Sequence, residues 1–412
     1  MKRYFDDALK LSLAGIIAAV SLSGCAAAQE AAPETISAAP ASERALSDNP
    51  LYSDLDNPTT PADLPQTASV LEVERYRPNY QLKGCAASPI MYVRPNGALA
   101  DAITAAKTYS DEQRGLGLIV MMGGAVLHES YADGVTRVTP SASASMMKSV
   151  VALLYGIAIE DGVIGSVDDR VGDYLEEWNE DPRGDITLRQ LMTMSAGLGQ
   201  SDFMQILLSP DIGQAALAVK MVGDPETEFS YNNAITKLLT MALDRRLAAS
   251  GKGGFLTYLE DELWCPLGND DANVWVDQQG KARGYAGLHA GLADYARIGE
   301  LIRKNGKAGG KQIVPASWIA EMAKPSKVNP QYGLHIWTGL EHTAQRAYSA
   351  TNPIKVPHSE PFVDKDIVYF DGFGGQRVYV IPSKDLTIAR IGEVNLQYDD
   401  AIIPNLLSNA TD

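Results

Sequence analysis

The chain has 412 residues, 45% of them hydrophobic, and is therefore long enough to bury a substantial core. Its formal net charge of −16 argues against nucleic acid and anionic membrane surfaces as binding partners. The histidines and cysteines show no His-x-x-x-His or Cys-x-x-Cys spacing, and the glycine-rich stretches lack the spacing of dinucleotide- and phosphate-binding loops. Neither a metal nor another cofactor is expected.

The first 24 residues have the pattern of a targeting segment. Lys2 and Arg3 precede an apolar run over residues 11–22, which is short for a membrane span. Residues 22–25 read Leu-Ser-Gly-Cys and resemble the lipobox of bacterial lipoproteins. The resemblance implies cleavage before Cys25, a lipid anchor on its sulfur, and a place in the bacterial cell envelope, on the periplasmic face of the outer membrane. A plain secretory signal with a chance cysteine is the alternative.

Residues 25–70 are predicted to form a flexible tether. The segment is rich in Ala, Pro, Glu, Ser and Thr, and Tyr52 is its only aromatic residue, so it lacks the side chains of a core. The folded domain is therefore predicted over residues 71–412. Cys85 and Cys265 lie within it and are able to pair in an oxidising compartment, but the sequence leaves their proximity open.

The folded region begins with two predicted strands over residues 117–134, around a turn at Gly123-Gly124. An apolar helix is predicted over residues 145–160, and the segment 167–288 is predicted to be mostly helical. Within and after that segment the pattern predicts helices at 187–194 and 233–249 and strands at 366–370, 376–381 and 386–391. Strands at both ends with helices between them indicate an α+β domain. In it, an antiparallel sheet built from both ends is flanked by helices, and the mostly helical subdomain is inserted.

The apolar helix opens on Ser145-Met-Met-Lys148, and a serine and a lysine three positions apart share one helical face. Lys148 is the only cation in the stretch from Ser145 to Glu160. A lysine in a buried helix loses its proton more readily than an exposed lysine does. A neutral lysine beside a hydroxyl is a general base next to a nucleophile. An ordinary helix start, with the serine as a cap and the lysine reaching solvent, accounts for the same residues.

Tyr231-Asn232-Asn233 is the only Tyr-x-Asn sequence in the chain. A tyrosine near a serine–lysine pair is able to carry protons, and an asparagine amide is able to hold a substrate carbonyl or orient the lysine. A turn followed by a helix cap at Asn232 or Asn233 is the alternative.

A glycine-rich element precedes the strand predicted at 376–381. It reads Gly372-Phe373-Gly374-Gly375-Gln376. Glycines allow a backbone to approach a substrate closely, and a strand edge offers N–H groups to a developing oxyanion. A simple hairpin turn explains the same sequence.

In this order, Ser-x-x-Lys, Tyr-x-Asn and a late glycine-rich element resemble the serine β-lactamase-like superfamily. The resemblance is to the branch of class C β-lactamases, D-Ala-D-Ala carboxypeptidases, family VIII esterases and 6-aminohexanoate-dimer hydrolases. Further matching segments are Gly156–Ile164, Val167–Tyr174, Ile186–Leu198, Trp264–Gly268 and Gly287–Arg297. The resemblance implies a β-lactamase/transpeptidase-like fold.

The resemblance also implies a role for each motif residue. Ser145 would attack a carbonyl and form an acyl-enzyme, and Lys148 would act as the base or hold Tyr231 in a proton-accepting state. Tyr231 would protonate the leaving group and later activate water. Asn233 would contact the substrate. The Ser145 N–H and an N–H of the stretch Phe373, Gly374, Gly375 and Gln376 would form the oxyanion hole.

One departure bears on the substrate. Lactamases and peptidases usually carry Lys-Thr-Gly or His-Thr-Gly where this chain has Phe373-Gly374-Gly375-Gln376, and the Gly-Gly-Gln form is more like the nylon oligomer hydrolases and esterases. Strand alternation directs Arg377 away from Gln376, so Arg377 is predicted to be structural. His128, His289 and Tyr155 lie in strand-like or apolar contexts and are also predicted to be structural.

Three functions follow in order of preference. The first is a lipid-anchored serine hydrolase of a small amide or ester, of the 6-aminohexanoate-dimer hydrolase type. The second is a class C-type β-lactamase or a D-Ala-D-Ala carboxypeptidase. The third is a non-catalytic envelope protein that uses the cleft for binding, against which the presence of Ser145, Lys148 and Tyr231 together argues.

Overall fold

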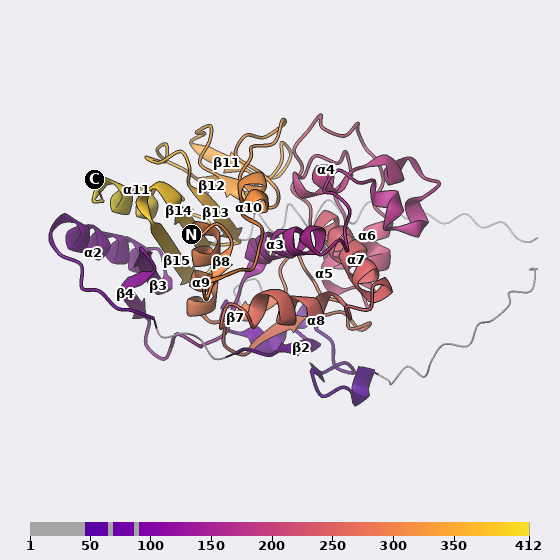
Figure 1. The fold of residues 1–412 in the computed structure, drawn as a ribbon, viewed down its shortest axis with the longest axis horizontal. Coiled ribbons are helices and arrows are strands. Elements are labelled where there is room, and N and C mark those ends of the chain that lie inside the picture. Colours follow the sequence, from indigo (N-terminus) through magenta and orange to yellow (C-terminus); the bar gives the residue numbers. More distant parts are fainter. Residues whose placement is uncertain (1–45, 65–68, 86–89, 412) are drawn as a thin grey trace, which may run out of the picture. The chain divides into compact units, whose positions relative to one another are not determined.

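The computed structural model describes residues 46–64, 69–85 and 90–411, so the predicted targeting segment and Cys25 lie outside the described residues. The described chain contains two larger antiparallel sheets, of six and five strands, and two small two-stranded ones, with helices packed around and between the larger two (Figure 1). None of the helices in these residues is long and apolar enough to cross a membrane.

The larger sheet joins strands from the two ends of the folded region, as predicted. Its strand order is β10-β13-β14-β15-β3-β4. These strands are β3 (Gly115–Met122), β4 (Ala125–Tyr131), β10 (Trp337–Thr338), β13 (Val368–Gly372), β14 (Gln376–Ile381) and β15 (Leu386–Gly392). The last strand pairs with the first long one, with Ile388 opposite Val120. The predicted turn between β3 and β4 is present, and Gly123 and Gly124 adopt the positive φ angles (58° and 88°) that such a turn requires.

Helices cover both faces of this sheet. On one face α9 (Leu292–Arg303) packs so closely that a Cβ on Gly299 would meet Val378. The neighbouring residue of β14, Tyr379, points to the other face, where its hydroxyl contacts that of Tyr398. Here α2 (Gly97–Glu112) and α11 (Ile402–Asn409) pack against each other. The strands β13, β14 and β15 are therefore buried on both sides, whereas most of the edge strand β4 is half-buried.

A second sheet, in the order β1-β2-β6-β7-β5, was not predicted. Its strands are β1 (Tyr52–Ser53), β2 (Asn79–Leu82), β5 (Ser141–Ala142), β6 (Ala272–Trp275) and β7 (Leu288–Ala290). They are short and come from distant parts of the chain, so local alternation does not reveal them. Two of them lie within or at the end of the segment 167–288, which otherwise is helical.

The predicted boundary of the tether is wrong, because residues 46–64 belong to the folded unit. Tyr52, the only aromatic residue of the predicted tether, pairs with Tyr80 in the second sheet, and the two rings lie 5.2 Å apart. Thr59 is buried, and its hydroxyl donates to the carbonyl of Arg77 at 3.0 Å. Composition describes the segment as a whole and misses these two anchoring side chains.

The middle of the chain supplies the predicted helical subdomain. Its helices are α4 (Leu188–Met192), α5 (Phe203–Leu208), α6 (Ile212–Leu217), α7 (Asn233–Ala249) and α8 (Phe255–Leu259). The range of α7 agrees with the prediction, and α4 is shorter than predicted. The remaining elements are β8 (Lys307–Ala308), β9 (Lys311–Gln312), α10 (Ala316–Met322), β11 (Gln345–Ala347) and β12 (Lys355–Pro357).

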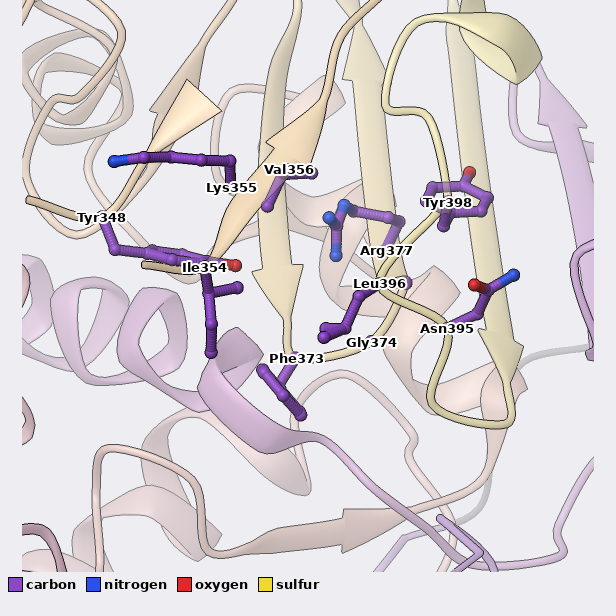
Figure 2. Close-up of a pocket in the computed structure, with 11 residues that line it drawn as sticks. Tyr348, Ile354, Lys355, Val356, Phe373, Gly374, Arg377, Asn395, Leu396 and Tyr398 are labelled. Carbon is purple, nitrogen blue, oxygen red and sulfur yellow. The ribbon is translucent and has the colours of Figure 1, made fainter. Parts of the chain in front are cut away.

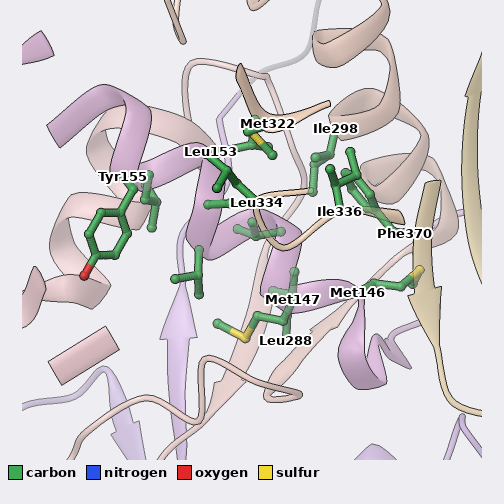
Figure 3. Packing of buried hydrophobic residues seen from close by; sticks show 14 of the residues in the cluster. Met146, Met147, Leu153, Tyr155, Leu288, Ile298, Met322, Leu334, Ile336 and Phe370 are labelled. Atoms are coloured by element: carbon green, nitrogen blue, oxygen red, sulfur yellow. The ribbon is translucent and has the colours of Figure 1, made fainter. Parts of the chain in front are cut away.

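The helix that follows Ser145, α3 (Met147–Glu160), runs through the centre of the domain, and all but its last two residues are buried. On one side the Tyr155 hydroxyl donates to the carbonyl of Leu239 on α7, and on another the Trp318 indole of α10 donates to the carbonyl of Ala152. Figure 3 shows its apolar side chains, Leu153 among them, within the common core. Each fully buried aliphatic side chain contributes roughly 1.5–3 kcal/mol, so α3 is held firmly in place.

Cys85 and Cys265 form a disulfide, which settles the pairing that the sequence left open. It joins the segment just after β2 to the turn after α8, and so links two regions that are 180 residues apart in the chain.

Candidate active site

The serine at the start of the apolar helix sits at a sharp turn between a strand and that helix. After β5, the Ser143 N–H donates to the carbonyl of Leu288 at 2.8 Å, which ties the turn to β7. Ala144 has a φ of 46°, an uncommon angle for a residue with a Cβ, and a single helical turn (Ala144–Met146) then leads into α3. The turn presents Ser145 at the N-terminal end of a buried helix, where the helix dipole favours negative charge.

The Lys148 ammonium nitrogen has three hydrogen-bond partners. Nζ lies 2.9 Å from the Ser145 hydroxyl oxygen, 2.8 Å from Oδ1 of Asn233 and 2.9 Å from the carbonyl oxygen of Tyr285. The last two are acceptors only. In the neutral amine, two N–H groups serve these two oxygens, and the lone pair faces the Ser145 hydroxyl. The geometry therefore orients the amine to accept the serine proton.

The surroundings of Lys148 favour this neutral form. Its side chain is 1% exposed, and burial lowers its pKa to about 7, an effect that the negative charge of Asp371 partly opposes. No described acidic residue forms an ion pair with it. At neutral pH a large fraction of Lys148 is thus uncharged, whereas an exposed lysine is almost wholly protonated.

Tyr231 completes the cluster from a different part of the chain. Its ring centroid lies 4.8 Å from the Lys148 nitrogen. Burial is the main cause that raises the pKa of its phenol, and Asp371 adds to it, whereas the Ser145 hydroxyl acts to lower it. The pKa is raised overall, so the phenol is neutral at physiological pH. A neutral phenol is suited to donate a proton rather than to accept the first one.

Aromatic neighbours fix the position of the Tyr231 ring. Trp337 stacks against it at 5.9 Å with an interplanar angle of 27°, and Tyr332 and Tyr348 lie at 5.9 and 5.2 Å. The Tyr231 N–H also donates to the carbonyl of Tyr348 at 2.9 Å. We refer to Trp337, Tyr332 and Tyr348 as the aromatic cage of Tyr231.

The two asparagines after Tyr231 have different positions. Asn232 caps α7, with its Oδ1 accepting from the Ala234 N–H at 3.0 Å, as the structural alternative predicted for one of the two. Asn233 is half-buried, and its Oδ1 accepts a hydrogen bond from Lys148. The structure thus brings together four predicted site residues, Ser145, Lys148, Tyr231 and Asn233.

The glycine-rich element forms the hairpin between β13 and β14 and approaches the serine turn. A Cβ on Gly372 would lie 2.5 Å from the carbonyl oxygen of Ser143, so only glycine permits this contact. Phe373, at the tip, is 41% exposed. Gly374 and Gly375 have φ angles of 79° and 99°, and their Cα atoms lie against Val394 and Tyr398 rather than against the serine.

Gln376 was predicted to belong to the stretch that offers an N–H to the oxyanion, and its side chain has a structural role. The side chain is fully buried, its nitrogen donates to the carbonyl of Gly392 at 2.9 Å, and its oxygen accepts from the Gly392 N–H at 2.9 Å. Gln376 therefore fastens the hairpin to β15 and has no free group for a substrate.

Behind the hairpin lies a small pocket, shown in Figure 2, which Phe373, Tyr348 and Leu396 help to line. The Arg377 side chain also reaches it, although its guanidinium is bound to Asp371 and Asp400. This agrees with the structural role predicted for Arg377.

Sequence reasoning missed several residues around the cluster. Tyr285 contributes a backbone carbonyl, which leaves no trace in the side-chain pattern. The cage residues and Asp371 lie more than 80 residues beyond Tyr231 in the chain. Asp371 also lies within a strand, where its apolar neighbours hide it.

The histidines that were predicted to be structural have structural surroundings. His289 is fully buried and has no partner at Nδ1 among the described residues, and His128 hydrogen-bonds to Ser130. Among the described residues, no group of three or more His, Cys, Asp or Glu side chains is arranged to hold a metal ion.

Comparisons with known proteins agree with this geometry. A sequence profile of the Beta-lactamase family matches residues 100–398. A search of curated protein sequences finds no significant match.

Solved structures share the fold of this chain but have little sequence identity with it. A Bacillus anthracis protein, described from its inferred role as a 6-aminohexanoate-dimer hydrolase, has a TM-score of 0.66 at 19% identity, covering 83% of this chain and 91% of its own. A family VIII carboxylesterase has a TM-score of 0.56 at 15% identity, covering 78% and 99%. A penicillin-binding protein homologue from Caulobacter crescentus has a TM-score of 0.55 at 15% identity, covering 79% and 100%. At these identities the likeness establishes the fold.

The profile match covers well over half of the chain, and the fold agrees with it from β3 to β15. Members of the matched family are serine hydrolases that act on amide or ester bonds. The chain belongs to the Beta-lactamase family of serine hydrolases.

Proposed function

We propose that this protein hydrolyses a small amide or ester through an acyl-enzyme on Ser145, in the manner of 6-aminohexanoate-dimer hydrolases and family VIII esterases. The observation that carries the proposal is the Lys148 nitrogen, 2.9 Å from the serine hydroxyl, buried, without an acidic partner among the described residues and with a pKa lowered to about 7. A binding protein has no need of such an amine.

In the acylation step, Lys148 accepts the proton of Ser145 while the serine oxygen forms a bond to the substrate carbonyl carbon. The resulting oxyanion receives hydrogen bonds from the Ser145 N–H and from an N–H at the start of the hairpin. The C–N or C–O bond then breaks, and the leaving group takes the hydroxyl proton of Tyr231. The Lys148 ammonium returns its proton to the phenolate, which restores both groups.

Deacylation follows the same route with water in place of the leaving group. The Tyr231–Lys148 pair removes a proton from water as it attacks the acyl carbon, and Ser145 leaves with a proton. The amide nitrogen of Asn233 donates a hydrogen bond to a carbonyl oxygen of the substrate.

The buried arginines around the hairpin are not available to bind a substrate carboxylate. A β-lactam or a peptide terminus carries a carboxylate, which a free cation near the glycine-rich element would bind. Arg390, which donates to the hairpin carbonyl of Gly375 at 2.6 Å, is fully buried. Arg346 and Arg377 are 0% and 2% exposed and are paired with Asp371 and Asp400. Their charges are already compensated.

The experiment is a substrate panel with the soluble protein from residue 46. It contains p-nitrophenyl acetate and butyrate, a linear 6-aminohexanoate dimer and a chromogenic cephalosporin, with Ser145→Ala as the matched control. We expect turnover of the esters or the linear amide that is lost in the variant. Dominant turnover of the cephalosporin would move the protein to the β-lactamase alternative. If neither turnover nor fluorophosphonate labelling depends on Ser145, the proposal is wrong.

We also propose that the mature protein is anchored to the bacterial envelope by a lipid on Cys25. The Leu-Ser-Gly-Cys sequence at 22–25 carries this proposal, and the disulfide between Cys85 and Cys265 supports an oxidising compartment. Metabolic labelling with a palmitate analogue should mark the full chain and not its Cys25→Ser variant. Equal labelling of both would contradict the anchor.

A further inference from the structure

Four charged side chains form a buried cluster beside the aromatic cage of Tyr231. Arg346 of β11 and Arg377 of β14 pair with Asp371 of β13 and with Asp400, just before α11. All four are at most 2% exposed, and the nitrogen–oxygen distances are 2.5–2.9 Å. The charges sum to zero, as burial at this depth requires.

The two aspartates differ in what else they hold. The carboxylate of Asp400 is bound only by the two arginines. The carboxylate of Asp371 also accepts a hydrogen bond from the Tyr348 hydroxyl at 2.7 Å. Only Asp371 therefore connects the charged cluster to the cage by a direct hydrogen bond.

This connection reaches Tyr231 by two routes. Tyr348 holds both the backbone and the ring of Tyr231, as described above. The guanidinium of Arg346, which Asp371 fixes, lies 3.8 Å from the ring centroid of Trp337, and Trp337 stacks on Tyr231. The positions of Tyr348 and Trp337 thus both depend on the Asp371 carboxylate.

We propose that Asp371 is a positioning residue for the hydrolysis: it fixes Tyr348 and Trp337 around Tyr231 and supplies the negative charge that balances the cations beside the Ser145–Lys148 pair. This inference rests on the proposed function. It assigns a role to a carboxylate that touches neither the nucleophile nor the substrate.

The charge of Asp371 acts on a nearly neutral environment. The titratable or charged side chains that face Lys148 are Tyr231 before α7, Tyr285 before β7, His335 before β10 and Asp371 on β13. Burial raises the pKa of both tyrosines and lowers the pKa of His335 to about 3, so these three are neutral near pH 7. Of these four side chains only Asp371 is therefore charged, and its negative charge stabilises the protonated form of Lys148.

The test follows the titration of Lys148 directly, in protein labelled with 13C at the lysine ε carbon and assigned with Lys148→Met. In Asp371→Asn, the cluster gains a net positive charge, and we expect the pKa of Lys148 to fall by about 0.5–1 unit. Asp400→Asn makes the same change of charge without touching Tyr348 and should give half that shift or less. No shift in Asp371→Asn, or an equal shift in both variants, would overturn the proposal. This readout needs no turnover, so it is independent of the substrate assignment.

Tyr348→Phe tests the mechanical part and serves if Asp371→Asn does not fold, which thermal unfolding will show. It removes the hydrogen bond and retains every charge of the cluster. We expect kcat on the best substrate of the panel to fall about 3–10-fold, with KM and the Lys148 titration unchanged. An unchanged kcat in the folded variant would overturn the positioning role. A wild type without turnover dependent on Ser145 would instead refute the proposed function.

Discussion

Two lysines are fully buried in this domain, and they have opposite surroundings. Lys148 on α3 contacts a hydroxyl and two carbonyl oxygens, with no acidic partner among the described residues. Lys237 on α7 donates to the carbonyl of Ala282 at 3.2 Å and lies 3.9 Å from the carboxylate of Asp277. Burial lowers both pKa values, to about 7 for Lys148 and to about 8 for Lys237, where Asp277 opposes the effect.

The difference shows that burial alone does not make a lysine reactive. Both side chains have lost water, and both lie on buried parts of helices. Asp277 needs the positive charge of Lys237, because an unpaired carboxylate in the interior is costly. Nothing comparable keeps the proton on Lys148, and its lone pair faces a hydroxyl. The partner therefore distinguishes a structural lysine from a basic one.

The strongest test of this contrast is to replace each lysine by methionine. Lys148→Met should lower kcat/KM by about 10³-fold or more, because the serine loses its base. Lys237→Met should leave it within about threefold, since Lys237 contacts no site residue. Hydrolysis of p-nitrophenyl butyrate measures both, with circular dichroism to confirm folding. An equal loss in folded Lys237→Met would remove the distinction.

The free energy of unfolding should fall more in Lys237→Met than in Lys148→Met. In Lys237→Met, Asp277 remains buried without its cation, although three backbone N–H groups still bind it. We expect the free energy of unfolding at pH 7 to fall by about 3 kcal/mol. Urea denaturation measures the change. The double variant with Asp277→Asn should recover part of the loss, and no recovery would show that the pair is not the cause.

The pH dependence of stability tests the lowered pKa of Lys148. Lys148 has a lower pKa in the folded state than in the unfolded chain, so between pH 7 and pH 10.5 the unfolded state binds more protons and stability rises with pH. Lys148→Met lacks this contribution. From pH 7 to pH 9 the stability of wild type relative to Lys148→Met should rise by about 2 kcal/mol. Parallel stability curves for the two proteins would contradict a lowered pKa.

The pH dependence of activity should follow Lys148 alone. Because the neutral amine is the base, kcat/KM should rise about tenfold per pH unit below pH 7 and level off above it. Lys237→Met should show the same profile. A rate profile without a limb near pH 7, or a limb that moves in Lys237→Met, would assign the base elsewhere.

Local spacing predicted part of the site correctly. A helix places residues three apart on one face whatever surrounds it, so Ser145 and Lys148 were expected to meet, and they do at 2.9 Å. Tyr231 and Asn233 were included through a family resemblance, because no local rule connects them with a helix 85 residues earlier. For Gln376 the hairpin was predicted from the glycines, but the two hydrogen bonds of its side chain to Gly392 were not, because that partner lies 16 residues away.

The sequence by itself determined the elements with a strong period: the apolar helix after Ser145, α7, the hairpin at Gly123-Gly124 and the late strands, together with the α+β class. Only the tertiary structure decided the second sheet, the anchoring of Tyr52, the disulfide, the cage of Tyr231 and the cluster around Asp371. The physical reason is the distance along the chain between the residues that interact. Hydrogen bonding within a helix or hairpin is decided over a few residues, whereas the pKa of Lys148 depends on desolvation and on partners 85 and 137 residues away.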